Sequence, residues 1–154
     1  MGGNLGDREK NLATARELIA RECGNIIAAS SVYETAAWGK TDQPSYLNQA
    51  LGVETSLNAK QLMKRILNLE NAMGRIRAEK FGPRIIDIDI LLFNKEKHNY
   101  EYLKIPHPEL QNRRFALLPL AEIAPEMEHP VFHKTIAELL NDCPDKLDVI
   151  IYKG

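Results

Sequence analysis

The chain has 154 residues, of which 44% are hydrophobic and 27% are charged, and its formal net charge is −1 at pH 7. This length and composition are typical of one globular domain. A net charge near zero argues against a nucleic-acid-binding surface, which usually makes a domain strongly basic. Cys23 and Cys143 lack metal-type spacing, and we see neither a signal peptide nor a membrane span, so we expect a cytoplasmic protein with free thiols.

Hydrophobic periodicity and capping residues predict the secondary structure. The predicted helices are residues 8–22 after the cap Asp7, 59–74 after the cap Asn58, about 111–122, and a short one after Thr135. The predicted strands are residues 25–34, 46–55, 85–93 and 146–152. The second helix has an apolar stripe formed by Leu62, Ile66, Leu69 and Met73, and we expect Glu70 to lie off this stripe.

The order of these elements predicts the fold class. Helix, strand, strand, helix and strand in succession are typical of a ferredoxin-like α+β sandwich with an antiparallel sheet. A glycine-containing turn over residues 2–6 leads into the first helix, and such a turn ordinarily follows a strand. We therefore expect the first strand of this fold to be missing from the chain as given, and the sandwich to carry C-terminal additions.

Asp87 and Asp89 are the most informative residues, because they interrupt an apolar run. The run is Ile85-Ile86-Asp87-Ile88-Asp89-Ile90-Leu91-Leu92-Phe93. Side chains alternate between the faces of a strand, so both aspartates should lie on one face, about 6 to 7 Å apart. Two such charges repel by roughly 3 kcal/mol at an effective dielectric constant of about 20. A pair of Mg²⁺ ions would relieve this repulsion, and a solvated strand face is the alternative.

Basic residues surround the acidic pair in the sequence. They are Arg75, Arg77, Lys80 and Arg84 before it, and Arg113 and Arg114 after it. Guanidinium groups can bind two phosphate oxygens at once, and carboxylates hold hard cations. The combination favours phosphoryl or nucleotidyl transfer, whereas a solvated basic loop is the alternative for the arginines.

Several motifs together resemble one known family. The segment Lys80-Phe81-Gly82-Pro83-Arg84-Ile85-Ile86-Asp87-Ile88-Asp89-Ile90-Leu91 resembles the signature of the 6-hydroxymethyl-7,8-dihydropterin pyrophosphokinases. The supporting matches are Gly2-Gly3-Asn4-Leu5-Gly6-Asp7, Ser31-Val32-Tyr33-Glu34-Thr35, Asp42-Gln43-Pro44-Ser45-Tyr46-Leu47-Asn48, Pro106-His107-Pro108 and Asn112-Arg113-Arg114-Phe115-Ala116-Leu117-Leu118-Pro119-Leu120. They occur in the order of the family and cover most of the chain.

The resemblance implies a pyrophosphokinase domain over residues 1–154 that acts in folate biosynthesis. Such an enzyme transfers pyrophosphate from ATP, its co-substrate, to the hydroxymethyl group of the pterin and releases AMP. The resemblance further implies two Mg²⁺ ions on Asp87 and Asp89, with attack of the substrate hydroxyl on the β-phosphorus. We expect small-molecule substrates, no nucleic acid and no membrane as partners, and a monomer, with a homodimer as the alternative.

The resemblance also implies roles for individual residues. The implied catalytic residues are Arg75, Arg84, Asp87 and Asp89. The implied ATP-binding residues are Glu70, Arg77, Ile90, His107 and Arg113. The implied pterin-binding residues are Trp38, Tyr46, Asn48, Phe81 and Phe115, of which the two phenylalanines would stack on the ring.

Two other classes of protein stay open on the sequence alone. A palm-type nucleotidyltransferase or metal-dependent nuclease also combines such a sheet with an acidic pair, but it needs a long basic groove for a polymer. A ligand-binding or RNA-binding module on the same fold would present exposed aromatic residues on a central strand, where this chain carries aspartates.

Overall fold

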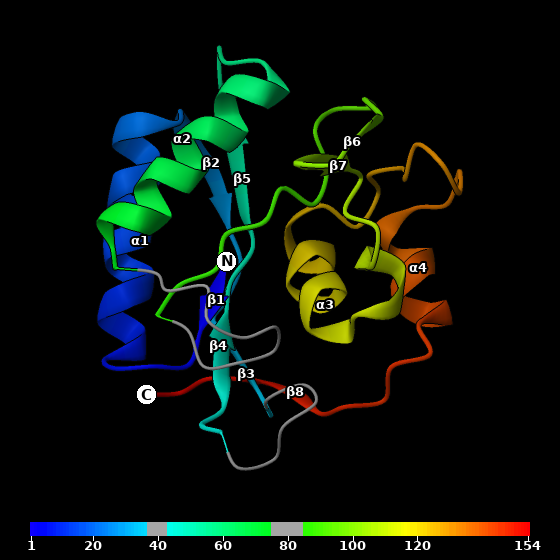
Figure 1. The fold of residues 1–154 in the computed structure, drawn as a ribbon. Coiled ribbons are helices and arrows are strands. Elements are labelled where there is room, and N and C mark those ends of the chain that lie inside the picture. The colour runs from blue at the N-terminus through cyan, green and yellow to red at the C-terminus, as the bar shows by residue number, and fades with distance from the viewer. Residues whose placement is uncertain (37–42, 75–84) are drawn as a thin grey trace.

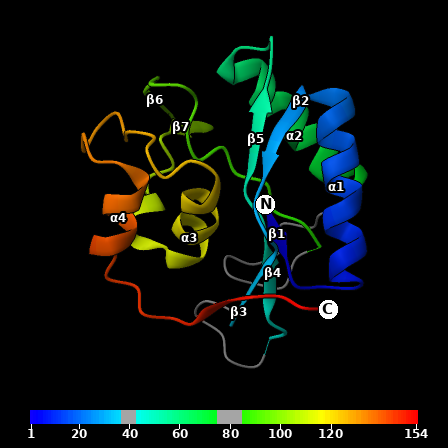
Figure 2. The ribbon, with the colours of Figure 1, turned by 180° about the vertical axis from the view of Figure 1, so that it is seen from behind.

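The computed structural model describes residues 1–36, 43–74 and 85–154. Its helices lie on both sides of a small antiparallel sheet, so the predicted α+β class is confirmed (Figure 1). Two helices lie on one side, α1 (Arg8–Glu22) and α2 (Ala59–Ala72), and two on the other, α3 (Arg114–Ile123) and α4 (Ile136–Asp142). Figure 2 shows the same two layers from behind. None of the helices in the described part of the chain is long and apolar enough to cross a membrane.

Short strands build the sheets. They are β1 (Gly2–Gly3), β2 (Asn25–Ala29), β3 (Tyr33–Thr35), β4 (Tyr46–Asn48), β5 (Leu51–Glu54), β6 (His98–Tyr100), β7 (Leu103–Ile105) and β8 (Val149–Ile151). The largest sheet has the order β1-β4-β3-β8, and β2 with β5 and β6 with β7 form two-stranded sheets. All of these pairings are antiparallel.

The glycine pair at the start of the chain is part of the sheet rather than of the turn predicted there. In β1, Gly2 pairs with Asn48 and Gly3 pairs with Leu47 of β4. Gly2 also forms a β-bridge with Asp87 on its other side. Two strand residues therefore precede α1, and they lie between β4 and the acidic segment.

The predicted strands 25–34 and 46–55 are each divided in two, because side chains replace backbone partners at the break. The Ser30 hydroxyl accepts a hydrogen bond from the Ala50 N–H (2.9 Å), and the Gln49 side-chain amide donates to the Ser30 carbonyl (2.7 Å). Arg16 of α1 donates to the side-chain carbonyl of Gln49 (2.8 Å). These bonds satisfy buried polar groups that a regular ladder would otherwise pair.

Helices α1 and α2 form as the sequence predicts. Asp7 caps α1 by accepting from the Lys10 N–H (3.1 Å), and Asn58 and Gln61 form a reciprocal capping box at α2. The predicted apolar faces are buried in one core cluster, whose helical members include Leu12, Ala15, Ile19, Leu62, Ile66 and Leu69. Burial of each large aliphatic side chain stabilises the fold by about 1.5–3 kcal/mol, which holds both helices against the acidic segment.

The segment over residues 85–93 is extended but is not the regular strand that the sequence predicts. Ile86, Ile88 and Ile90 are buried in the core, so the predicted alternation of faces is confirmed. Among the described residues, however, the segment forms a single bridge, at Asp87. Because β1 is only two residues long, it offers no longer ladder to pair with.

The C-terminal part forms a second core. Leu110, Leu117 and Leu120 pack with Ile136 and Leu139 of α4. The helix predicted over about 111–122 begins later, at Arg114, because a 3₁₀ turn (Leu110–Asn112) precedes it. Thr135 caps α4 as predicted, and the terminal strand is shorter than predicted and lies at the edge of the sheet.

Candidate active site

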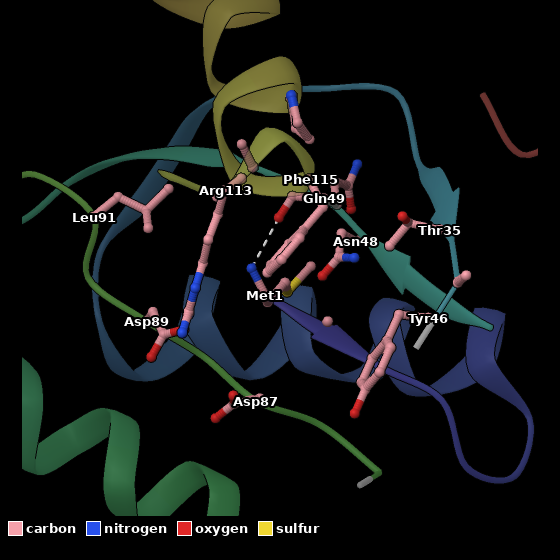
Figure 3. A pocket seen from close by; sticks show the side chains of 15 residues that line it. Met1, Thr35, Tyr46, Asn48, Gln49, Asp87, Asp89, Leu91, Arg113 and Phe115 are labelled. Atoms are coloured by element: carbon pink, nitrogen blue, oxygen red, sulfur yellow. Dashed lines mark hydrogen bonds between the residues drawn. The ribbon is translucent and has the colours of Figure 1, made fainter. Parts of the chain in front are cut away.

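A cavity of about 250 Å³ lies where the sheet, the acidic segment and the start of α3 meet. The predicted site residues that line it are Tyr46, Asn48, Asp87, Asp89, Arg113 and Phe115 (Figure 3). They come from β4, from the segment after residue 85, and from the N-cap and first turn of α3. The fold thus brings together residues that are up to about seventy positions apart in the chain (Tyr46 to Phe115).

The two aspartates form the acidic end of the cavity. Both line it, so the prediction that they face the same way is confirmed. The backbone of Asp87 is held by Gly2: the Asp87 N–H donates to the Gly2 carbonyl (2.7 Å), and the Gly2 N–H donates to the Asp87 carbonyl (2.9 Å). Asp89 is exposed.

The carboxylates of Asp87 and Asp89 fit a divalent cation only if a bound ligand supplies further oxygen atoms. Mg²⁺ is usually held by one or two carboxylates, with phosphate oxygens and waters completing an octahedral shell. Within residues 1–36, 43–74 and 85–154 there is no group of three or more His, Cys, Asp and Glu side chains that could hold a metal ion. Asp87 and Asp89 therefore match an ion that is shared with a polyphosphate better than an ion caged by protein alone.

Glu70 lies behind the acidic pair, not in the cavity lining. Its side chain is 2% exposed, and its Oε2 accepts a hydrogen bond from the Ile88 N–H (2.8 Å). The prediction that Glu70 lies off the apolar stripe of α2 is wrong, because it follows Ile66 by one helical turn and shares its buried face. Its polar group is accommodated there by a backbone donor.

Two other residues that the resemblance assigns to ATP also lie outside the lining. The side chain of Ile90 is 8% exposed and belongs to the core, so only its backbone can meet a ligand. His107 is tied to the acidic segment, because its N–H donates to the Leu91 carbonyl (3.0 Å). Its Nδ1 accepts from the Glu109 N–H (3.2 Å), so in the neutral ring the proton is on Nε2.

The charge state of His107 follows from its surroundings. Burial lowers its pKa, Arg113 lowers it further, and the carboxylates of Asp89 and Asp87 oppose both effects. With a pKa below the ordinary value of 6.5, the ring is mainly neutral at pH 7. It can then donate a hydrogen bond from Nε2 without adding a full positive charge.

The opposite end of the cavity carries an amide and aromatic rings. Asn48 lies beside Gly2, where a Cβ atom would overlap the Asn48 Oδ1, so only glycine leaves room for this amide. Phe115 is half-buried, and the Arg113 guanidinium carbon lies 5.8 Å from its ring centroid. In Figure 3, Arg113 extends from the N-cap of α3 towards Asp89, and Tyr46 lies on the other side of Asn48.

A hydrogen-bonded network anchors α3, which supplies part of this wall. The Tyr33 hydroxyl donates to Glu122 Oε1 (2.5 Å), and the Ser31 N–H donates to Glu122 Oε2 (2.8 Å). Burial and the hydrogen bond to Glu122 raise the pKa of Tyr33 to about 12. The same hydrogen bond is the main cause that lowers the pKa of the Glu122 carboxyl.

The remaining predicted residues lie outside the part of the chain that the structure describes. They are Trp38, Arg75, Arg77, Phe81 and Arg84. Conversely, sequence reasoning missed Gly2, Thr35 and Gln49 as residues of the lining. Thr35 ends a motif that resembles the family, but no role followed from this motif. The Gly2-Gly3 pair was a signal for Gly2, but close backbone approach and a turn require glycine equally.

The fold and the site together define an α+β protein with a bipartite cavity. One end has paired carboxylates with a basic side chain and a neutral imidazole nearby, and the other has an amide and aromatic rings. This arrangement suits a ligand pair in which one member is a polyphosphate and the other is a flat polar ring.

Comparison with known proteins identifies the family. The family model described as 7,8-dihydro-6-hydroxymethylpterin-pyrophosphokinase matches residues 1–125. The chain therefore belongs to this family. Residues 126–154, which include α4 and β8, lie beyond the matched region.

Two bacterial relatives carry one shared name, 2-amino-4-hydroxy-6-hydroxymethyldihydropteridine pyrophosphokinase. The protein of Bacillus subtilis is 43% identical over 129 residues, which cover 83% of this chain and 77% of the relative. The protein of Aquifex aeolicus is 41% identical over 138 residues, which cover 90% of this chain and 86% of the relative.

A solved structure agrees with the fold. The crystal structure of Plasmodium falciparum HPPK-DHPS with pteroate superposes with a TM-score of 0.71 at 20% identity. The match covers 92% of this chain but only 41% of the Plasmodium chain. At this identity the likeness concerns the fold alone.

Proposed function

We propose that the protein transfers pyrophosphate from ATP to 6-hydroxymethyl-7,8-dihydropterin, giving AMP and the pterin pyrophosphate, as a step of folate synthesis. Family membership and the shared name of the relatives support this activity. The observation that carries the proposal is that one cavity joins Asp87 and Asp89 to Asn48 and Phe115. A polyphosphate and a pterin bound at these two ends would meet inside it.

At the acidic end, Asp87 and Asp89 would hold two Mg²⁺ ions together with the triphosphate of ATP. When bound, these ions would neutralise phosphate charge and lower the pKa of the substrate hydroxyl, which then attacks the β-phosphorus. Arg113 would bind phosphate oxygens through its guanidinium, and His107 would donate from Nε2. Ile90 would contact the nucleotide through its backbone only.

At the other end, the chain would orient the pterin. Asn48 has both a donor and an acceptor, which suits the alternating polar edge of the ring. Phe115 would stack on one face of the ring, and Tyr46 would border it. Holding both reactants in a fixed geometry converts a bimolecular reaction into an effectively unimolecular one, which can supply about 7–11 kcal/mol of the barrier reduction.

The residues outside the described ranges keep the roles that the resemblance implies. Arg75, Arg77 and Arg84 would bind the triphosphate, and Phe81 and Trp38 would border the pterin. We further propose that residues 1–154 act as one ferredoxin-like domain and as a monomer.

The nature of the products tests this function directly. The protein is incubated with ATP, Mg²⁺ and the hydroxymethyl-dihydropterin, and the nucleotides are followed by ³¹P NMR. The proposal requires AMP and a new pterin diphosphate ester in equal amounts. Formation of ADP, or no turnover while both substrates bind, would refute it.

A further inference from the structure

Glu70 is a buried acidic side chain whose surroundings the proposed chemistry does not explain. It is 2% exposed, so any contact that it makes is with protein rather than with solvent. Burying a carboxylate is costly unless hydrogen bonds compensate for lost water. The Ile88 N–H supplies such a bond at 2.8 Å, and it joins α2 to the acidic segment.

This bond holds the first of the two peptide groups between the two aspartates. The carbonyl of that group belongs to Asp87 and accepts from the Gly2 N–H (2.9 Å), while its N–H belongs to Ile88 and donates to Glu70. A peptide group is planar, so partners at both of its ends determine the orientation of the plane. The Asp87 N–H, bound to the Gly2 carbonyl (2.7 Å), holds the preceding group as well.

The backbone torsions on either side of this plane set the directions of the two Cα–Cβ bonds. Asp87 precedes the plane, and Asp89 follows it by one residue, so a net change in ψ of Asp87 or in φ of Ile88 would take the two side chains off the shared face of the extended segment. Glu70 and Gly2 lie on opposite sides of it, in α2 and in β1. Without the Glu70 carboxylate, Gly2 would still bind the Asp87 carbonyl, but the Ile88 N–H would lose its hydrogen bond in the core.

The geometry points to Glu70 as a positioning residue for the cation site: by accepting the Ile88 N–H, it keeps Asp87 and Asp89 directed at shared divalent ions. It acts through the backbone of the acidic segment, and this role is separate from the nucleotide contact that the family resemblance implies for it. This inference rests on the proposed function, since it concerns the cations of the same site.

Two variants separate the hydrogen bond from the charge. Glu70→Gln keeps the length of the side chain and an acceptor oxygen but removes the charge. Glu70→Asp keeps the charge but withdraws the acceptor by one methylene group, beyond reach of the Ile88 N–H. Glu17→Gln and Glu17→Asp are matched controls, because Glu17 is an exposed residue of α1.

The measurement is the affinity for Mn²⁺ in the presence of α,β-methylene-ATP, followed by electron paramagnetic resonance, which does not depend on turnover. Loss of a group that orients a metal ligand typically costs about 10–100-fold in metal affinity. We therefore expect Glu70→Asp to weaken Mn²⁺ binding by at least about 10-fold. Glu70→Gln should retain most of the affinity, and both Glu17 variants should match the wild type.

Other outcomes would overturn the inference. A loss in Glu70→Gln with retention in Glu70→Asp would mean that the charge acts, and equal affinity in all variants would mean that the bond does not orient the ligands. Amide hydrogen exchange at Ile88, slow in the wild type and in Glu70→Gln and fast in Glu70→Asp, checks the mechanism in the folded proteins. AMP formation by the wild type is scored separately, so a failure of the proposed function is distinguishable from a failure of this inference.

Discussion

Gly2 and Asp87 exchange two backbone hydrogen bonds, of 2.9 Å from the Gly2 N–H and 2.7 Å from the Asp87 N–H. On its other side Gly2 pairs with Asn48. One glycine therefore joins the acidic end of the cavity to the end that we assign to the pterin. A change at this position should disturb both ends at once.

The first prediction concerns the space that Gly2 leaves free. In Gly2→Ala the new methyl group would overlap the Asn48 side-chain oxygen and lie 2.9 Å from the Leu47 carbonyl, so Asn48 must move. We expect the KM for the pterin to rise by about 10-fold or more, as for a displaced hydrogen-bonding group worth about 1–2 kcal/mol. Steady-state kinetics measure it.

Gly52→Ala is the control for this change. Gly52 lies in β5, outside the cavity lining. The new methyl group would lie 3.3 Å from the Ala28 Cβ. It should alter the melting temperature without altering the KM for the pterin. An unchanged KM in Gly2→Ala would mean that Asn48 does not bind the pterin.

The second prediction tests the need for two carboxylates. Asp89→Ala leaves one aspartate, which cannot position a pair of ions. We expect kcat to fall by at least about 10²-fold, the scale found for groups that neutralise transition-state charge. Asp142→Ala is the control. It removes an exposed ion pair between Asp142 of α4 and Lys134, and it should keep normal kinetics. Near-normal turnover by Asp89→Ala would contradict the two-ion site.

The third prediction concerns ring stacking. Phe115→Ala should weaken pterin binding by about 1–3 kcal/mol, the scale of stacking between bases and aromatic side chains. Fluorescence titration with the pterin in the presence of an ATP analogue measures it. Phe132→Ala removes a ring that is 44% exposed and stacks on His129, and it should leave the pterin affinity intact. If Phe115→Ala binds the pterin as tightly as Phe132→Ala does, Phe115 belongs to the core and not to the site.

The fourth prediction is a pH dependence of stability. The Tyr33–Glu122 bond lowers the pKa of Glu122, so its contribution is present above the unfolded value of about 4.3 and is lost as the pH falls through the lowered value. The pKa of Tyr33 is raised to about 12. The stabilisation by the Tyr33–Glu122 hydrogen bond is therefore complete below about pH 10, the pKa of tyrosine in the unfolded chain, and is lost as the pH rises towards 12.

Tyr33→Phe isolates this contribution. The free energy of unfolding should be lower in the variant than in the wild type by a constant amount between about pH 5 and pH 10. The difference should shrink on both sides of this window. Urea titrations at several pH values measure it, and a difference that does not depend on pH would mean that the hydroxyl acts through packing alone.

The parts of the fold that follow from local chemistry were accessible from the sequence. Asp7 and Asn58 cap the predicted helices because a cap needs only a side-chain acceptor and a nearby backbone donor. The alternation of Ile86, Ile88 and Ile90 gave the buried face of the acidic segment. The opposite face, with both aspartates, then followed from strand geometry.

The parts that depend on distant partners were not accessible. The break in the two long strands depends on Gln49 meeting Ser30 and Arg16, and no local pattern announces these contacts. The burial of Glu70 likewise depends on the Ile88 N–H of another segment. Phe115 could be assigned to the site only through the family resemblance, since an aromatic residue at the start of a helix is usually part of a core.

The central claim is that Asp87 and Asp89 share divalent ions with the phosphates of ATP. A crystal structure with Mn²⁺, α,β-methylene-ATP and the pterin tests it most directly, because anomalous scattering identifies manganese by element. We predict two anomalous peaks about 3.5–4 Å apart, each within coordination distance of an aspartate oxygen and of the triphosphate. Manganese bound elsewhere, with both carboxylates turned to solvent, would contradict the account.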